Sequence, residues 1–247
     1  MNKILILIIS FLFLSCKNDK EKRGFLPKGE SYSKNHVLKE VKKDVVYKEY
    51  YDTGTLRLRT KYLKGIISDS IFQYYRNGKL KEKGLVHKGL KTGWWNYYSV
   101  KGGLKSKNEY VIINDSLYKN QTISYYNNGK INYDLSSFFK IELADTLSLG
   151  KNAAKLYYHS NFNNVAKKFL YVIIENVYSK NKIVKDSFMN EDNYTRFGVF
   201  AEKEGLKTIK GTVLEKLLYI KKISNDSSEL IFKSHKKYFE RNVYVKK

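Results

Sequence analysis

The chain has 247 residues, of which 42% are hydrophobic, and it carries a formal net charge of +23 at pH 7. This length is enough to bury a sizeable core and to build one or two domains. The charge predicts attraction to anionic partners such as a membrane surface, an acidic glycan or an acidic protein. The single cysteine, Cys16, excludes a disulfide framework.

Residues 1–15 have the pattern of a secretory signal peptide. Lys3 gives a positive start, and the run from Ile4 to Leu14 is apolar except for Ser10. This run is too short for a membrane-spanning helix, which needs roughly 20 residues. We therefore expect residues 1–15 to be a cleaved signal.

Cys16 follows the expected signal directly, and Ser15 places a small residue before it. The sequence LFLSC of residues 12–16 resembles the lipobox of bacterial lipoproteins. That resemblance implies that Cys16 is acylated, so we expect a bacterial cell-envelope protein anchored by lipid, with the outer membrane as its partner. Nucleic acid would suit the charge but not this location. The alternative is an ordinary signal peptide followed by a chance cysteine.

Residues 16–46 are predicted to form a flexible tether. They mix both signs of charge, contain the only proline, Pro27, and show no sustained period of 2 or 3.6. A segment of this composition does not bury enough apolar surface to fold by itself.

Residues 47–139 contain four similar units. Tyrosine pairs begin at positions 50, 74, 97 and 125, at intervals of 24, 23 and 28 residues, and each is followed by glycine and then by leucine or isoleucine. A regular period of this size is typical of stacked repeats. Alternation of apolar and basic residues after the glycine predicts a strand, and Asn, Asp and Gly predict hairpin turns. The residues that define the units are Tyr51, Gly54, Tyr75, Gly78, Gly89, Gly93, Trp95, Tyr98, Gly103, Tyr126 and Gly129.

Large aromatic side chains are expected to form the core of this array. We expect the tyrosine pairs, Phe72 and Trp95 to stack from unit to unit.

The second unit carries a family resemblance most fully. Its residues are Gly78, Leu80, Gly84, Lys88, Gly89, Gly93, Trp95, Tyr97 and Tyr98. They resemble the MORN-repeat variant of the YwqK-type, antitoxin-like family. The resemblance implies a curved ribbon of β-hairpins with a role in binding or scaffolding.

Six basic residues are candidates for binding an anionic ligand. Aligning the units places Arg57, Lys81 and Lys105 in one column, and a second column contains Arg59, Lys83 and Lys107. Period-2 alternation puts both columns on the face opposite Leu56. The alternative is an ordinary solvated lysine face that discourages edge-to-edge aggregation.

Residues 140–247 are predicted to form an antiparallel β-sandwich. Phe169 to Ile174 show no alternation and suggest a central strand buried on both sides, whereas alternation from Tyr238 to Val245 suggests a strand with one buried face. Val213 to Ile223 could be a helix, but we favour a strand. The remaining expected strands are 156–158, 197–200, 208–219 and 229–232.

Catalysis, metals and cofactors find little support in the sequence. The four histidines are scattered, and no phosphate loop, nucleophile elbow or paired-cysteine metal motif occurs. Asp186, Glu191 and Asp192 could form an acidic pair in space. The sequence therefore predicts an all-β, membrane-anchored, non-catalytic binding or scaffold protein. A toxin-neutralising or immunity-type protein and a surface glycan hydrolase are the alternatives.

Overall fold

The computed structural model describes residues 45–247 apart from 64–65, 68–69, 88, 179–181 and 192. These residues form sixteen β-strands and no helix, which confirms the all-β prediction. In this part of the chain no helix is long and apolar enough to cross a membrane. The expected signal peptide, Cys16 and all but the end of the expected tether lie outside the described residues.

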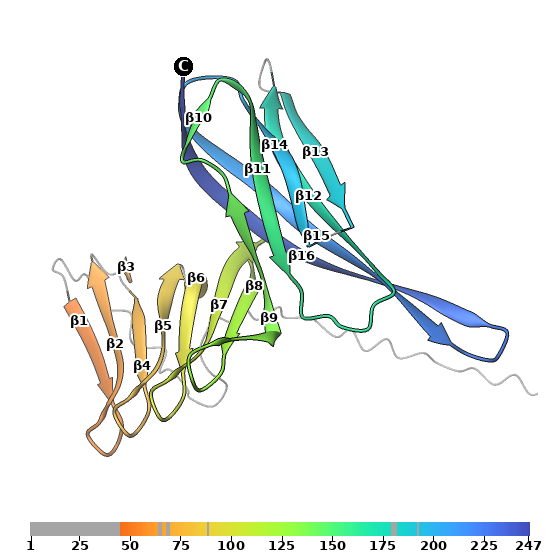
Figure 1. Cartoon of the computed structure of the whole chain (residues 1–247). Coiled ribbons are helices and arrows are strands. Elements are labelled where there is room, and N and C mark those ends of the chain that lie inside the picture. Colours follow the sequence, from red (N-terminus) through yellow and green to blue (C-terminus); the bar gives the residue numbers. More distant parts are fainter. Residues whose placement is uncertain (1–44, 64–65, 68–69, 88, 179–181, 192) are drawn as a thin grey trace, which may run out of the picture.

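The repeats form a ribbon of antiparallel strands, which Figure 1 shows in orange to green. We call the strands from residue 45 to residue 137 the ribbon. Its strands are β1 (Val45–Tyr50), β2 (Leu56–Leu63), β3 (Ile66–Ile67), β4 (Ile71–Tyr74), β5 (Leu80–His87), β6 (Leu90–Tyr98), β7 (Leu104–Ile113), β8 (Ser116–Tyr125) and the first part of β9 (Ile131–Glu142). The first strand starts two residues before the expected boundary at residue 47.

Four equivalent turns set the true repeat period. In the first, Gly54 N donates to Tyr51 O at 2.9 Å and Tyr51 N donates to Thr55 O at 2.8 Å, and the same pattern recurs at 75–79, 99–103 and 126–130. The turn glycines have positive φ, a conformation that glycine adopts without strain. They are Gly54, Gly78, Gly102 and Gly129.

The third unit therefore differs from its expected alignment. Its turn glycine is Gly102, with φ of 96°, and not Gly103. Ser99 occupies the place of the second tyrosine, so the pair Tyr97-Tyr98 is displaced by one residue. The turns recur at intervals of 24, 24 and 27 residues, from positions 51, 75, 99 and 126.

Tyrosine hydroxyls link successive units. Tyr51 Oη donates to Tyr74 O at 2.7 Å, and Tyr75 Oη donates to Tyr98 O at 2.8 Å. Neighbouring turns are joined as well, because Asn77 Nδ2 donates to Val100 O at 3.0 Å. These bonds satisfy backbone carbonyls and hold the units in register.

The C-terminal half is a β-sandwich that shares a sheet with the ribbon. Its strands are the second part of β9, β10 (Thr146–Ser148), β11 (Gly150–His159), β12 (Lys167–Tyr178), β13 (Lys182–Asn190), β14 (Tyr194–Ala201), β15 (Gly205–Lys222) and β16 (Ser228–Lys246). One eleven-stranded sheet runs from β1 to β9 and on to β11 and β14, and the second sheet has the order β10-β16-β15-β12-β13. The β10–β16 pair is parallel, unlike the rest of the predicted antiparallel sandwich. Strand β15 confirms the strand prediction for residues 213–222, one residue short of its expected end.

Strand β9 belongs to both halves of the molecule. Ile131 and Ser137 pair with β8, whereas Phe138 to Glu142 pair with β11. The expected boundary after residue 139 therefore falls inside one continuous strand.

The main core lies between the two sheets of the sandwich. Leu156, Val172, Ile174 and Val213 are fully buried there. Strand β12 is central, as predicted, but it is not buried on both sides, because Ile173 is only half-buried.

Cross-strand partners define two faces of the eleven-stranded sheet, since residues in register point to the same side. Trp95 pairs with Asn108, Asn108 with Thr122, and Thr122 with Ser137. Four residues further along β9, Ile141 pairs with Leu156 of the core. We call this side the inner face and the opposite side the outer face.

Phe72 does not lie where the expected aromatic core places it. It pairs with Lys83, which pairs with Asn96, so Phe72 lies on the outer face and Trp95 on the inner face. With a period of 24, Ile71 is the true equivalent of Trp95. The expected stacking of Phe72 with Trp95 is therefore wrong.

Candidate functional site

A row of basic side chains crosses the outer face of the ribbon. Pairing in register runs from β1 to β8 through Lys48, Arg59, Phe72, Lys83, Asn96, Lys107 and Ile123. We call Lys48, Arg59, Lys83 and Lys107 the basic row. The predicted column of Arg59, Lys83 and Lys107 thus shares one face, with an uncharged residue of an intervening strand between successive members.

The spacing of the basic row limits its self-repulsion. Successive members from Arg59 to Lys107 lie two strands apart, which corresponds to about 9.6 Å. That separation is close to the Debye length of about 8 Å at physiological salt, so the charges repel each other weakly. Lys48 and Arg59, in contrast, are direct neighbours on adjacent strands, so repulsion is strongest at this end of the row.

Members of the basic row are available to a ligand. Lys48 and Arg59 are exposed, and Lys83 and Lys107 are partly exposed. The Arg59 guanidinium lies 4.5 Å from the centre of the Phe72 ring, a contact that leaves its charge unneutralised. Among the described residues, no carboxylate forms an ion pair with a member of this row.

The other predicted column behaves differently. Arg57, Lys81 and Lys105 are each the unpaired residue of a β-bulge next to a turn, because the register shifts by one residue at each of them. A bulge breaks the alternation of side chains between faces. The prediction that period-2 alternation puts both columns opposite Leu56 therefore fails: Leu56 pairs with Tyr50, two residues from Lys48, and so lies on the same face as Arg59. Arg57 also forms a 3.1 Å ion pair with Glu49.

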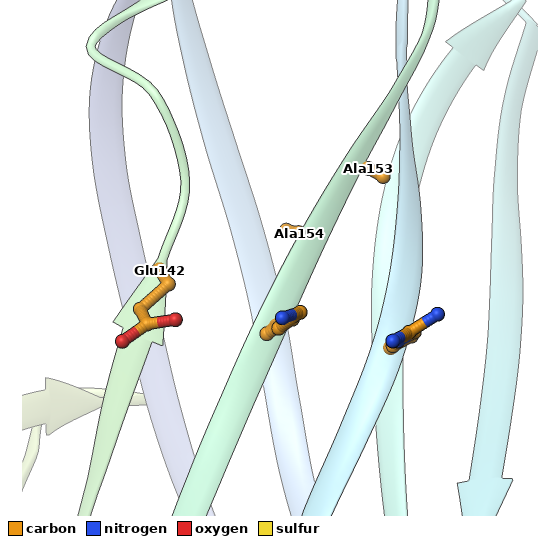
Figure 2. A pocket seen from close by; sticks show the side chains of 5 residues that line it. Glu142, Ala153 and Ala154 are labelled. Atoms are coloured by element: carbon orange, nitrogen blue, oxygen red, sulfur yellow. The ribbon is translucent and has the colours of Figure 1, made fainter.

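The outer face continues onto the sandwich with further basic residues. Lys155 pairs in register with Arg196 on one side and with Glu142 on the other. Together with Ala153 and Ala154 they line a hollow of about 350 Å³, which Figure 2 shows beside β9, β11 and β14. A hydrogen bond from Lys140 lowers the pKa of Glu142, so this carboxylate stays charged. Sequence analysis missed Lys48, Lys155 and Arg196, because only strand pairing brings them to this face.

A larger groove of about 710 Å³ lies between the ribbon and the second sheet. It is lined by Tyr110 and Glu109 of β7 and by Ile173, Tyr238 and other residues of the second sheet. Its charged side chains are already paired within the protein, with Lys210 3.2 Å from Glu240 and Lys185 3.5 Å from Glu175. The groove therefore presents fewer unpaired charged side chains to a ligand than the outer face does.

A buried ion pair stabilises the inner face of the ribbon. Lys91 Nζ lies 2.8 Å from Glu82 Oε2 and 4.0 Å from the centre of the Trp95 ring. Burial lowers the pKa of Lys91, and the hydrogen bond to Glu82 opposes this effect. Gly84 leaves room for the indole, because a Cβ there would lie 2.3 Å from Trp95. The cluster explains why Gly84 and Trp95 occur together, and its role is structural.

A second polar cluster joins the ribbon to the sandwich. Asn120 is the bulge residue of β8, and its side-chain amide donates to Tyr238 O and accepts from Tyr238 N, both at 2.7 Å. Lys237 Nζ donates to Asn120 O at 2.9 Å, and Asn120 Nδ2 also donates to Glu109 Oε2 at 2.6 Å. Burial lowers the pKa of Lys237 to about 8, an effect that Glu215 and Glu109 oppose. The bulge at Asn120 therefore fixes the ribbon against β16.

Asp186, one of the acidic residues considered for catalysis, already has partners within the protein. The Asp186 carboxylate accepts hydrogen bonds from Asn176 and Tyr178, both at 2.6 Å, and these bonds lower its pKa. Glu191 is exposed, and Asp192 lies outside the described residues. Within the described ranges, no group of three or more His, Cys, Asp or Glu residues could hold a metal ion.

Comparison with known proteins gives no family assignment. No family model, curated protein or solved structure matches the chain. The resemblance to MORN-type repeats therefore stays a prediction from the sequence.

Proposed function

We propose that the protein acts without catalysis, by binding an anionic polymer through the outer face of its eleven-stranded sheet. The observation that carries the proposal is the basic row, in which four cationic side chains lie in one register line without an acidic partner among the described residues.

The dimensions of the row suit an extended ligand. From Lys48 on β1 to Lys107 on β7 the line crosses five strand spacings, or roughly 24 Å. A polyanion lying across the strands would contact each member in turn, and their combined field would speed its capture. Lys155 and Arg196 extend the same face onto the sandwich.

Figure 1 shows the ribbon as an extended row of strands, and repeat proteins use extended arrays of this kind as binding surfaces. A protein held at the cell envelope through Cys16, as the sequence predicts, would present this face to envelope polymers or to acidic proteins.

Replacing the six predicted basic residues with glutamine tests the proposal. The variant changes Arg57, Arg59, Lys81, Lys83, Lys105 and Lys107. We expect it to bind an acidic polysaccharide at least about 100-fold more weakly than the parent chain, because each cation near an anionic surface contributes about 1 kcal/mol. Equilibrium binding at low and physiological salt measures the effect.

A control variant removes the same charge elsewhere. It carries glutamine at six exposed lysines: Lys167, Lys182, Lys203, Lys236, Lys246 and Lys247. We expect the control to lose much less affinity than the first variant. Equal losses would show that only net charge matters and would reject the outer face as the binding site.

A further inference from the structure

Strands β15 and β16 form a hairpin that extends beyond the sandwich, as Figure 1 shows in blue. The pairing of β12 with β15 ends at Leu218. From Tyr219 to Glu229 the two strands pair only with each other among the described residues. Within the described part of the chain, large side chains here stay exposed, as at Ile220, Leu230 and Phe232.

One side of the projecting hairpin is apolar. Leu218 pairs with Phe232, and Ile220 pairs with Leu230, so these four side chains share one side. Phe232 is 72% exposed, Ile220 58% and Leu230 57%. We call these four residues the apolar patch. Large apolar side chains gathered at one exposed place mark an interaction site.

Lysines flank the apolar patch at both ends. In register, Lys216 precedes it and Lys222 follows it on the same side of the hairpin. Residues 216–236 contain five lysines and two acidic residues, Asp226 and Glu229, which gives a net charge of +3. Cationic side chains around an exposed apolar surface match an anionic lipid bilayer, which accepts the apolar groups below its charged head groups.

We propose that the β15–β16 hairpin docks onto an anionic lipid surface, with the apolar patch inserted at the level of the head groups. This contact is separate from the polymer-binding outer face and does not depend on it. An amphipathic element of this kind would orient the molecule on a membrane, a role that the flexible tether predicted for residues 16–46 would not fill.

Co-sedimentation with vesicles tests the inference. The chain of residues 17–247 is used, because residues 4–14 would bind lipid by themselves and all sixteen strands lie in the remaining sequence. We expect the parent chain to bind vesicles with one-third phosphatidylglycerol, and the double variant Leu230→Ser/Phe232→Ser to bind them at least about 30-fold more weakly. Both residues are exposed, so the variant should fold normally.

The same hairpin offers a matched control. Leu206 and Tyr244 are paired in register at the opposite end of β15 and β16, and they are 76% and 55% exposed. The variant Leu206→Ser/Tyr244→Ser removes a similar apolar pair and should bind vesicles like the parent chain. Equal binding by the parent chain and both double variants would overturn the proposal.

Insertion and partner choice have separate readouts. In a Phe232→Trp variant, brominated phospholipids should quench the fluorescence of the added indole. Combining Phe232→Trp with Arg59→Gln/Lys83→Gln/Lys107→Gln should leave this quenching unchanged. The Leu230→Ser/Phe232→Ser variant should bind acidic polysaccharide as the parent chain does.

Sedimentation velocity without lipid tests whether the apolar patch joins two copies of the chain. If it shows a dimer that Leu230→Ser/Phe232→Ser abolishes, the patch is a dimer interface and the lipid proposal is rejected.

Discussion

Replacing Trp95 with alanine is expected to lower the free energy of unfolding by about 3–5 kcal/mol, the usual cost of removing a large buried aromatic side chain. Trp95 is 0% exposed on the inner face of the ribbon. Its Nε1 donates to Leu85 O at 2.8 Å, and its ring covers the Lys91 ammonium. The substitution would also admit water to the buried ion pair of Lys91 with Glu82. Urea unfolding followed by circular dichroism measures the loss.

Trp94 provides the matched control. It is the neighbouring residue, 41% exposed, and its partner Glu109 is adjacent to the partner of Trp95 along β7. Trp94→Ala should change the free energy of unfolding by about 1 kcal/mol or less. Since the chain contains two tryptophans, each variant keeps one fluorescent reporter. Similar destabilisation by both variants would mean that the inner face is not the packed side of the ribbon.

Replacing Asn120 with alanine is expected to weaken the junction between the ribbon and the sandwich. The substitution removes two hydrogen bonds to Tyr238 and one to the Glu109 carboxylate. Net values of about 1 kcal/mol for each neutral bond and about 2 kcal/mol for the charged one give a loss of about 4 kcal/mol. Because the two bonds to Tyr238 connect the ribbon to the sandwich, we expect the ribbon to melt before the sandwich, as two transitions in scanning calorimetry.

Lys119→Ala serves as the control for the junction, since Lys119 is the exposed neighbour of Asn120 on β8. It should melt like the parent chain. An Asn120→Ala variant that melts in one transition at the parent temperature would show that the shared strand β9 alone holds the halves together.

Local pattern was sufficient to predict the repeats and their hairpins. Glycine at the fourth position of each turn and the period near 24 residues are visible without any long-range information, and so is the strand β15. The predicted alignment of the third unit was displaced by one residue. Ser99 stands where the other units have the second tyrosine, and Tyr98 was mistaken for that residue. A motif search finds the tyrosine pair, but only the turn hydrogen bonds show which residue is equivalent.

It was harder to predict on which face of the sheet each side chain lies, because a bulge interrupts the alternation of side chains between the two faces. The pattern correctly grouped Arg59, Lys83 and Lys107, which lie in regular ladder positions. It gave the wrong geometry for Arg57 and its equivalents, since each is an extra residue in one strand. The partnership of Asn120 with Tyr238 joins residues 118 apart in sequence, and no local period reports such a contact.

The difference between ladder and bulge positions gives the most direct test of the proposed function. Arg59→Gln/Lys83→Gln/Lys107→Gln removes three cations from the basic row, and Arg57→Gln/Lys81→Gln/Lys105→Gln removes three from the bulges nearby. Binding to an acidic polysaccharide at physiological salt should fall at least about tenfold more for the first variant, because its side chains lie in one register line, whereas Arg57 of the second is already paired with Glu49. Equal losses for the two variants would contradict the proposal that the basic row is the binding site.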